Sequence, residues 1–247
     1  MRALLPEPAD DVNLHQWYAR DWVERGGIRV NMITSIDGAA AAKGLSEGLQ
    51  TPGDNHVFAA LRDLADVVLA GSGTVRAEGY APIELGERRT ELRRQYGLRP
   101  ALPTAVATRS MHLDPSSALF AEAHSDARPI VLTTESADPA ARAAFEPIAD
   151  VIVCGERDLD IGQIRRALAD RGLTRVLCEG GPTLFSQVAA AGEADEVCLT
   201  VAPLLVGPGA ARIVAGNGWT AGPRRLTLDG LLEEDGGLFL RLVAASG

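Results

Sequence analysis

Residues 67–79 read VVLAGSGTVRAEG, an apolar run that passes directly into two closely spaced glycines and a threonine. Four apolar residues in a row are typical of a strand buried on both faces, as in a parallel sheet. Glycine permits a tight turn and the close approach of a ligand, and a following helix would present unpaired N–H groups to a phosphate. The stretch predicts a strand–turn–helix unit in which Gly71, Gly73 and Thr74 hold a ligand or serve turn geometry alone.

The same alternation of short apolar runs and helical patterns extends in both directions from this unit. Residues 28–36 predict a strand, and Thr51 and Pro52 predict a helix start, with threonine as N-cap and proline in the first turn. Further strands are predicted at 104–108, 130–134, 151–154, 175–179 and 196–201, and helices near 138–145, 161–171 and 182–191. We therefore expect an α/β fold, a single domain whose mixed, mostly parallel sheet has flanking helices.

Three other segments depart from this alternation. Residues 226–232 and 238–243 flank an Asp-Gly-Gly turn, which predicts a C-terminal antiparallel hairpin with Leu238, Leu240 and Leu242 on one face. Residues 81–100 are rich in arginine and predict an exposed helix or excursion. No linker or repeat divides the chain, so we expect an N-terminal extension, 1–27, and one domain, 28–247. Trp17, Trp22 and Trp219 are expected to be packing or interface anchors.

Composition excludes several classes of function. The chain has 247 residues and a net charge of −9 from 24 Lys+Arg and 33 Asp+Glu, which argues against binding to nucleic acid or to an anionic membrane. Its three cysteines are far apart and its four histidines form no HExxH pattern, so we expect no metal site. Without a membrane-spanning apolar run or a signal peptide, a cytoplasmic protein is expected.

Two more strand ends carry candidate chemistry. Residues 179–184, EGGPTL, predict a second glycine turn entering a helix, with Glu179 where ligands of open α/β sheets bind. Two such turns suit a dinucleotide, although a tight turn with a solvated glutamate is the alternative. Asp37, before Gly38, would orient a substrate or transfer a proton, or belong to an ordinary Asp-Gly turn. Arg62 is either an anion ligand or a surface cation.

In this order along the chain, the motifs resemble the reductase domain of riboflavin biosynthesis. The resemblance covers residues 28 to about 245 and rests on Ser35-x-Asp37-Gly38, Leu61-Arg62, Ala65-Asp66-Val67 leading into Gly71-x-Gly73-Thr74-Val75, Glu179-Gly180-Gly181, and Ala202-Pro203-Leu204-Leu205-Val206-Gly207. It implies a dihydrofolate-reductase-like fold and an enzyme in which NADPH donates a hydride to C1′ of a ribosylamino-pyrimidinone phosphate. It also implies a small-molecule substrate and a homodimer.

The resemblance assigns roles to individual residues. The positions that would hold NADPH are Gly71, Gly73, Thr74, Glu78, Thr108, Arg109, Gly180, Gly181, Pro182, Thr183 and Leu184. Among these, Thr108 and Arg109 would lie near the adenosine 2′-phosphate. The substrate would be contacted by Ser46, Arg62 and Glu179, while Asp37 or Glu179 are the candidate catalytic residues, with water as the alternative proton source. Such an enzyme takes its reactivity from the cofactor, so it needs no catalytic histidine or cysteine.

Two departures from the family widen the choice of function. Where the family continues with Asp-Pro, leucine and a phosphate-gripping arginine, residues 78–85 read EGYAPIEL, so that the arginine position falls at or near Leu85. The zinc motifs of the companion deaminase domain are absent from the sequence. We expect a stand-alone NADPH-dependent reductase of the pyrimidinone phosphate or of a pterin-like C=N bond. A non-catalytic NADPH-binding sensor or interaction module is the alternative.

Overall fold

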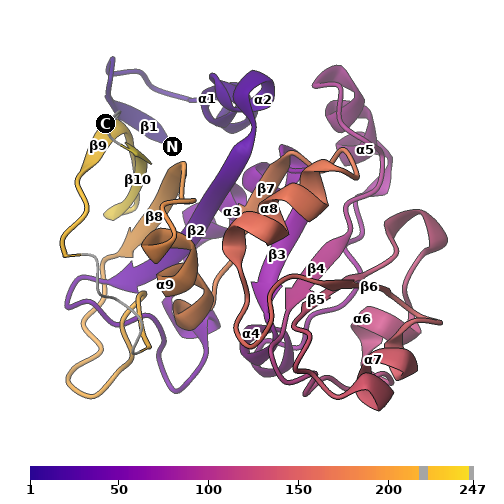
Figure 1. Cartoon of the computed structure of the whole chain (residues 1–247). Coiled ribbons are helices and arrows are strands. Elements are labelled where there is room, and N and C mark those ends of the chain that lie inside the picture. Colours follow the sequence, from indigo (N-terminus) through magenta and orange to yellow (C-terminus); the bar gives the residue numbers. More distant parts are fainter. Residues whose placement is uncertain (217–221, 245–247) are drawn as a thin grey trace.

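A computed structural model describes residues 1–216 and 222–244, and in them ten strands form one sheet in the order β1-β9-β10-β8-β2-β7-β3-β4-β5-β6 (Figure 1). The strands are β1 (Arg2–Leu5), β2 (Gly27–Ser35), β3 (Val67–Gly71), β4 (Thr104–Ala107), β5 (Ile130–Thr133), β6 (Asp150–Val153), β7 (Arg175–Cys178), β8 (Glu196–Ala202), β9 (Leu226–Glu234) and β10 (Gly237–Ala244). From β8 to β6 all neighbours are parallel, whereas β10, β9 and β1 add antiparallel at one end. The predicted α/β fold with its C-terminal hairpin is confirmed.

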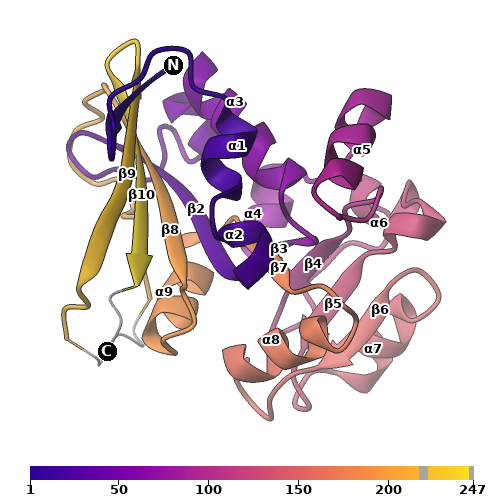
Figure 2. The same ribbon diagram turned by 90° about the horizontal axis from the view of Figure 1, so that it is seen from above.

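Helices pack on both faces of this sheet (Figure 2). They are α1 (Leu14–Ala19), α2 (Trp22–Arg25), α3 (Pro52–Asp63), α4 (Ser72–Ala77), α5 (Gly86–Gln95), α6 (Ala118–Ala121), α7 (Pro139–Phe145), α8 (Ile161–Ala169) and α9 (Pro182–Ala190). Successive side chains of a strand point to opposite faces, and β3 shows this clearly. Val67 and Leu69 lie in the core with α8 and α9, whereas Val68 packs toward α1 and α3 and Ala70 toward α4, α6 and α7.

The start and the end of α3 are fixed by two different devices. Thr51 accepts a hydrogen bond from the Asp54 backbone N–H at 3.1 Å, which confirms the predicted N-cap. At the other end the Arg93 guanidinium donates to the carbonyl oxygens of Arg62, Asp63 and Ala65. Within residues 81–100 a helix does form, α5, but Arg93 on it is fully buried, so the expectation of an exposed segment is wrong at this position. The buried arginine thus adds side-chain donors to carbonyls at and just beyond the helix end, where the helix itself supplies few.

Residues 1–27, expected to be an extension, contribute to the same sheet and core. β1 pairs antiparallel with β9, and Trp17, Tyr18 and Trp22 are buried beside α3. The two tryptophans are therefore packing anchors, while Trp219 lies outside the described residues. The boundary at residue 27 stays a prediction.

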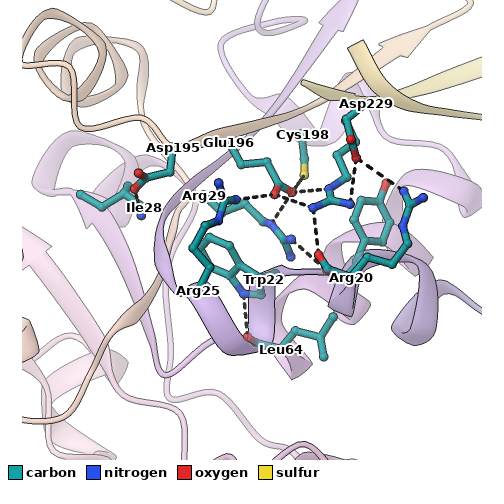
Figure 3. Close-up of polar contacts among 12 residues, drawn as sticks. Arg20, Trp22, Arg25, Ile28, Arg29, Leu64, Asp195, Glu196, Cys198 and Asp229 are labelled. Atoms are coloured by element: carbon teal, nitrogen blue, oxygen red, sulfur yellow. Dashed lines mark hydrogen bonds and ion pairs between the residues drawn. The ribbon is translucent and has the colours of Figure 1, made fainter. Parts of the chain in front are cut away.

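A buried ionic cluster, defined here as Arg29, Glu196 and Arg241, joins β2, β8 and β10. Figure 3 shows Arg29 and Glu196 of this cluster. Glu196 Oε1 lies 2.7 Å from Arg29 Nε and 3.0 Å from Arg241 Nε, and its Oε2 lies 3.0 Å from Arg241 Nη2. All three residues are at most 1% exposed. The Arg29 guanidinium also stacks over Trp22, with 4.1 Å between Cζ and the ring centroid. This cluster secures the N-terminal residues to the amino ends of the parallel strands.

The C-terminal hairpin presents two different faces. Leu238, Leu240 and Leu242 share one face, as predicted, but they are only partly buried. The fully buried side chains of β10 are Phe239 and Arg241, on the opposite face. Phe239 packs beside α1 and α3, and Arg241 enters the ionic cluster, so a charged residue occupies a position where alternation alone would place an apolar one.

Candidate active site

The carboxyl ends of five neighbouring parallel strands bring the predicted site residues to one edge of the sheet. In spatial order β8, β2, β7, β3 and β4 lie side by side and point the same way. Asp37 follows β2, Glu179 follows β7, Thr74 follows β3 and Arg109 follows β4. Ligands of open α/β sheets bind outside this edge, so the arrangement suits a binding site.

The two glycine turns meet at a cavity of about 490 Å³, which we call the glycine cavity. Its lining includes nine of the eleven residues expected to hold a cofactor: Gly71, Gly73, Thr74, Thr108, Arg109, Gly181, Pro182, Thr183 and Leu184. Gly180 lies directly behind it, since its carbonyl accepts a hydrogen bond from the Gly71 N–H at 2.7 Å. The lining also includes residues that sequence reasoning missed, namely Ser72, Ala107, Ser110, Asp158, Leu159 and Gln187.

The glycine cavity fits a phosphate-bearing ligand in two respects. A Cβ atom on Gly181 would lie 2.5 Å from Thr74 Oγ1, so only glycine leaves the backbone at the start of α9 accessible. Thr108 also lines the cavity, and its hydroxyl is buried without a hydrogen-bond partner in the described structure. An unpaired buried hydroxyl costs free energy unless a ligand satisfies it. The helix N-terminus, the bare glycine backbone and this hydroxyl together suit a dinucleotide.

Glu78 is the one predicted cofactor contact that the structure does not bring to the glycine cavity. Its Oε1 accepts hydrogen bonds from both the backbone N–H and the hydroxyl of Ser46, each at 3.0 Å. Glu78 follows α4 directly, so this contact ties the helix to the 3₁₀ turn Ser46–Leu49. The expectation followed sequence position after the glycine turn, whereas the end of α4 carries the side chain toward Ser46.

Three buried or part-buried side chains, Arg62, Tyr80 and Glu179, form what we call the Glu179 cluster. Arg62 binds Glu179 through two parallel contacts, Nε to Oε1 at 2.7 Å and Nη2 to Oε2 at 2.8 Å. The Tyr80 hydroxyl donates to Glu179 Oε2 at 2.5 Å. Arg62 also stacks on Phe58, with Cζ 4.2 Å from the ring centroid. Arg62 and Glu179 were both predicted at the substrate, and the structure shows them bound to each other.

Protonation in the Glu179 cluster follows from these contacts. Burial, with the charge of Glu179 as the second cause, raises the pKa of Tyr80 well above its usual value of 10.0, so the hydroxyl keeps its proton. Burial alone would lower the pKa of Arg62, but the Glu179 carboxylate outweighs it and the net shift is upward. The cluster is therefore a fixed set of donors around a carboxylate. Sequence reasoning missed Tyr80, whose position after the glycine turn was the available signal.

Asp37 is held as an anion on an exposed turn. Its carboxylate accepts hydrogen bonds from the Ser35 hydroxyl at 2.5 Å, from the Val206 N–H at 3.2 Å and from the Gly207 N–H at 2.7 Å. These bonds, that from Ser35 first, lower the pKa of Asp37 to about 2. Asp37 therefore carries no proton to deliver near neutral pH, which removes one of the expected proton sources. Its contacts instead fix the segment after β8 to the end of β2.

We expect the Asp37 carboxylate to stay ionised in the folded protein down to about pH 2. A pKa lower in the folded than in the unfolded chain stabilises the fold at high pH, and this contribution is lost as pH falls from about 4 through 2. Carboxyl-carbon NMR of the folded protein, followed from pH 7 to pH 3, should show no titration of Asp37. Ser35→Ala should bring the midpoint back toward that of an ordinary aspartate. A midpoint near 4 in the unaltered protein would contradict this assignment.

Leu85 occupies an apolar environment. It is buried in the core with α3 and Leu102, where a phosphate contact has no place. Within residues 1–216 and 222–244, no group of three or more His, Cys, Asp or Glu side chains is arranged to hold a metal ion. In the same residues no helix has the length and apolar character needed to cross a membrane.

Comparisons with known proteins bear on the family of this chain. The family model described as the RibD C-terminal domain matches residues 27–240. The chain is 28% identical over 192 residues to 2,5-diamino-6-ribosylamino-4(3H)-pyrimidinone 5′-phosphate reductase of Methanothermobacter thermautotrophicus, covering 77% of this chain and 84% of that protein. It is also 28% identical over 195 residues to the riboflavin biosynthesis protein RibD of Mycobacterium tuberculosis, covering 78% of this chain and 47% of that protein.

Solved structures of a pyrimidine reductase-like protein and of a riboflavin biosynthesis reductase have a similar fold. A pyrimidine reductase-like protein from Corynebacterium diphtheriae superposes with a TM-score of 0.87 at 25% identity, covering 96% of this chain and 100% of that chain. The riboflavin biosynthesis reductase Rib7 of Saccharomyces cerevisiae shares the fold with a TM-score of 0.64 at 17% identity, covering 89% of this chain and 90% of that chain. The family resemblance inferred from the motifs is confirmed, and the chain belongs to the RibD C-terminal domain family.

Proposed function

We propose that this protein is an NADPH-dependent reductase that transfers a hydride to a heterocyclic substrate, in the first place a ribosylamino-pyrimidinone phosphate of riboflavin biosynthesis. One observation carries the proposal. The three-residue turn Glu179–Gly180–Gly181 connects the glycine cavity on one side to the Glu179 cluster on the other. A cofactor and a polar substrate bound at these two places would meet at the end of β7. Family membership and the names of the curated relatives support the same reaction.

The residues of this chain position the reactants rather than react themselves. NADPH, when bound, supplies the hydride from its nicotinamide ring. The Gly181 backbone, Thr74 and the buried Thr108 hydroxyl would hold the cofactor along the sheet edge. The Glu179 carboxylate, kept in place by Arg62 and Tyr80, would accept a hydrogen bond from the substrate. Holding the two reacting carbons at near-attack distance supplies much of the rate enhancement of such an enzyme.

Water is the proton source that fits this site best. The acceptor nitrogen must gain a proton when the neighbouring carbon gains the hydride. Asp37 is ionised, and Tyr80 holds its proton tightly because its pKa is raised. Both oxygens of Glu179 already accept hydrogen bonds, from Arg62 and from Tyr80. Asp37 and Tyr80 are thus poor acids near neutral pH, and we assign the proton to solvent.

We expect Glu179→Gln to lower kcat/KM by at least about a hundredfold, because it breaks a buried carboxylate–guanidinium pair and leaves Arg62 without its partner. NADPH binding, measured by calorimetry, should persist within a few-fold, since Glu179 does not line the glycine cavity. Glu156→Gln, a change on an exposed loop, serves as the control. Calorimetry that detects no NADPH binding to the unaltered protein would refute the proposal.

NADPH binding together with NADPH oxidation distinguishes the competing functions. A non-catalytic sensor or interaction module would bind NADPH without oxidising it in the presence of any candidate substrate. A spectrophotometric assay of NADPH oxidation, run in parallel with the pyrimidinone phosphate and with a dihydropterin-type substrate, distinguishes the two reductase reactions. The names of the relatives favour the pyrimidinone phosphate. The apolar surroundings of Leu85 favour a substrate whose phosphate, if it has one, binds elsewhere.

A homodimer in the cytoplasm completes the proposal. Leu226 and Leu228 on β9 are 38% and 41% exposed and lie beyond the residues of β9 that pair with β1, and apolar side chains there are suited to an interface. Cys154, Cys178 and Cys198 are free thiols, as expected in a reducing compartment. Light scattering should report twice the mass of one chain, and a monomer at micromolar concentration would contradict the dimer.

A further inference from the structure

The glycine cavity contains two charged side chains, and they bind each other. Arg109 Nη1 lies 3.0 Å from Asp158 Oδ1. Among the residues that line the cavity in the described part of the chain, Arg109 carries the one positive charge and Asp158 the one negative charge. The charged lining of the cavity is therefore neutral, although the proposed cofactor is an anion. Asp158 was not part of any sequence motif. Its carboxylate cancels the charge of Arg109, so it determines the net charge of the cavity lining.

Topology shows which end of a dinucleotide would lie beside this pair. Glu179 and Gly181 both follow β7, so the cofactor phosphates would lie at Gly181 and the reacting end beside the neighbouring Glu179 cluster. Arg109 follows β4, and Asp158 lies between β6 and α8. Neighbouring strands are about 4.8 Å apart, so β7 and β6, with three strands between them, are separated by roughly 19 Å. The adenosine end of the cofactor would therefore meet Arg109 and Asp158.

The backbone fixes where Asp158 stands. The Cys154 N–H donates to the Thr133 carbonyl at 2.7 Å, and the Asp160 N–H donates back to the Cys154 carbonyl at 3.0 Å. Gly155 has φ +120°, and a Cβ atom there would collide with the Asp158 carbonyl oxygen. This tight turn places Asp158 on the lining of the cavity, and the side chain of Asp160 then caps α8.

We propose that Asp158 is a specificity-determining residue that sets the preference between NADPH and NADH. This inference rests on the proposed use of a nicotinamide cofactor. An arginine accommodates the 2′-phosphate of NADPH, whereas an acidic side chain accepts a hydrogen bond from the ribose 2′-hydroxyl of NADH. Here both groups stand side by side. The 2′-phosphate must displace Asp158 from Arg109 and is repelled by it, while a 2′-hydroxyl gains an acceptor. Asp158 therefore reduces the preference for NADPH that Arg109 alone would give.

The test measures affinity rather than turnover. Dissociation constants for NADPH and NADH, and for the adenosine halves 2′,5′-ADP and 5′-AMP, are determined by calorimetry. In Asp158→Asn we expect the affinity ratio of NADPH to NADH to rise about tenfold, the combined size of one exposed ion pair and one charge-assisted hydrogen bond. Arg109→Gln should lower the ratio by a similar factor. The 2′,5′-ADP to 5′-AMP ratio should shift in parallel, because the effect arises at the adenosine end.

Asp150→Asn is the matched control, because it breaks a comparable exposed pair outside the cavity, Asp150 Oδ1 to Arg128 Nε at 3.0 Å. We expect it to leave all four dissociation constants unchanged. If Asp158→Asn still binds both cofactors and the ratio of their affinities is unchanged, the role of Asp158 is overturned, whereas the proposed function stands. Failure of the unaltered protein to bind either cofactor would instead overturn the proposed function on which the inference rests.

Discussion

Replacing Glu196 with alanine is expected to lower the free energy of unfolding by about 3–5 kcal/mol, the typical cost of removing one partner from a buried ion pair. Glu196 is fully buried and pairs with both Arg29 and Arg241, which are buried as well. Without it, two guanidinium groups face each other in the core, with half-buried Asp229 as the nearest remaining acid on Arg241. A typical surface substitution changes the free energy of unfolding by no more than about 0.5 kcal/mol, so the expected loss is several times larger.

Urea unfolding followed by circular dichroism measures this difference. Glu156→Ala, on an exposed loop, should change the free energy of unfolding by less than about 0.5 kcal/mol. The triple variant Arg29→Met, Glu196→Leu, Arg241→Met removes all three charges together and should recover most of the loss, since apolar residues of similar volume often replace buried ion pairs without penalty. A loss below 1 kcal/mol in Glu196→Ala would show that the pairs contribute little.

The same cluster predicts an acid-sensitive step in stability. Burial alone would raise the pKa of Glu196, but Arg29 and Arg241 outweigh it and lower the pKa in the folded chain. A lowered pKa stabilises the fold above the unfolded value, about 4.3 for glutamate, and this contribution disappears as pH falls below it. The variant without Glu196 should therefore lose less stability between pH 5 and pH 3 than the unaltered protein does.

Local patterns predicted the fold because the periodicity of strands and helices depends on residues that are close together in the sequence. The N-cap at Thr51, the buried run of β3 and the hairpin turn before β10 all formed as expected. Charged side chains that act across the chain followed no such pattern. Arg93 lies in an arginine-rich helix that looks solvent-exposed, yet it caps the carbonyls at the end of α3. Glu196 pairs with Arg29 only because β2 and β8 lie in parallel register.

In the candidate site, too, some features were predictable from the sequence and others were not. Backbone features such as the two glycine turns were predictable, because glycine at a strand–helix junction has a direct geometric meaning. The contact partners of individual side chains could not be predicted from the sequence. Glu78 contacts Ser46 rather than the cavity, and Tyr80 reaches Glu179 across 99 positions of sequence. Asp158 enters the cavity from a turn that no motif marks. Such pairings depend on where helices end in space, which a single sequence does not encode locally.

Gly181→Asp is expected to weaken NADPH binding by at least about a hundredfold, or 2.7 kcal/mol, while the sheet remains folded. Gly181 has φ −67°, a conformation open to any residue, so the backbone itself tolerates a side chain. The cost arises in the glycine cavity. A Cβ atom would lie 2.5 Å from Thr74 Oγ1, and a carboxylate would stand at the positive end of α9, where the cofactor phosphates would otherwise bind.

Two companion variants separate the steric part of this effect from the charge. Gly181→Asn has nearly the same size without the charge, so it should bind NADPH more tightly than Gly181→Asp, by an amount that shrinks as salt is added. Thr74→Ala combined with Gly181→Ala removes the collision and should restore the melting temperature lost in Gly181→Ala alone. Calorimetry and thermal unfolding record the two readouts on the same samples. Gly181→Asp with unchanged NADPH affinity would place the cofactor away from α9, because a phosphate held at that helix end cannot tolerate a carboxylate in the same space.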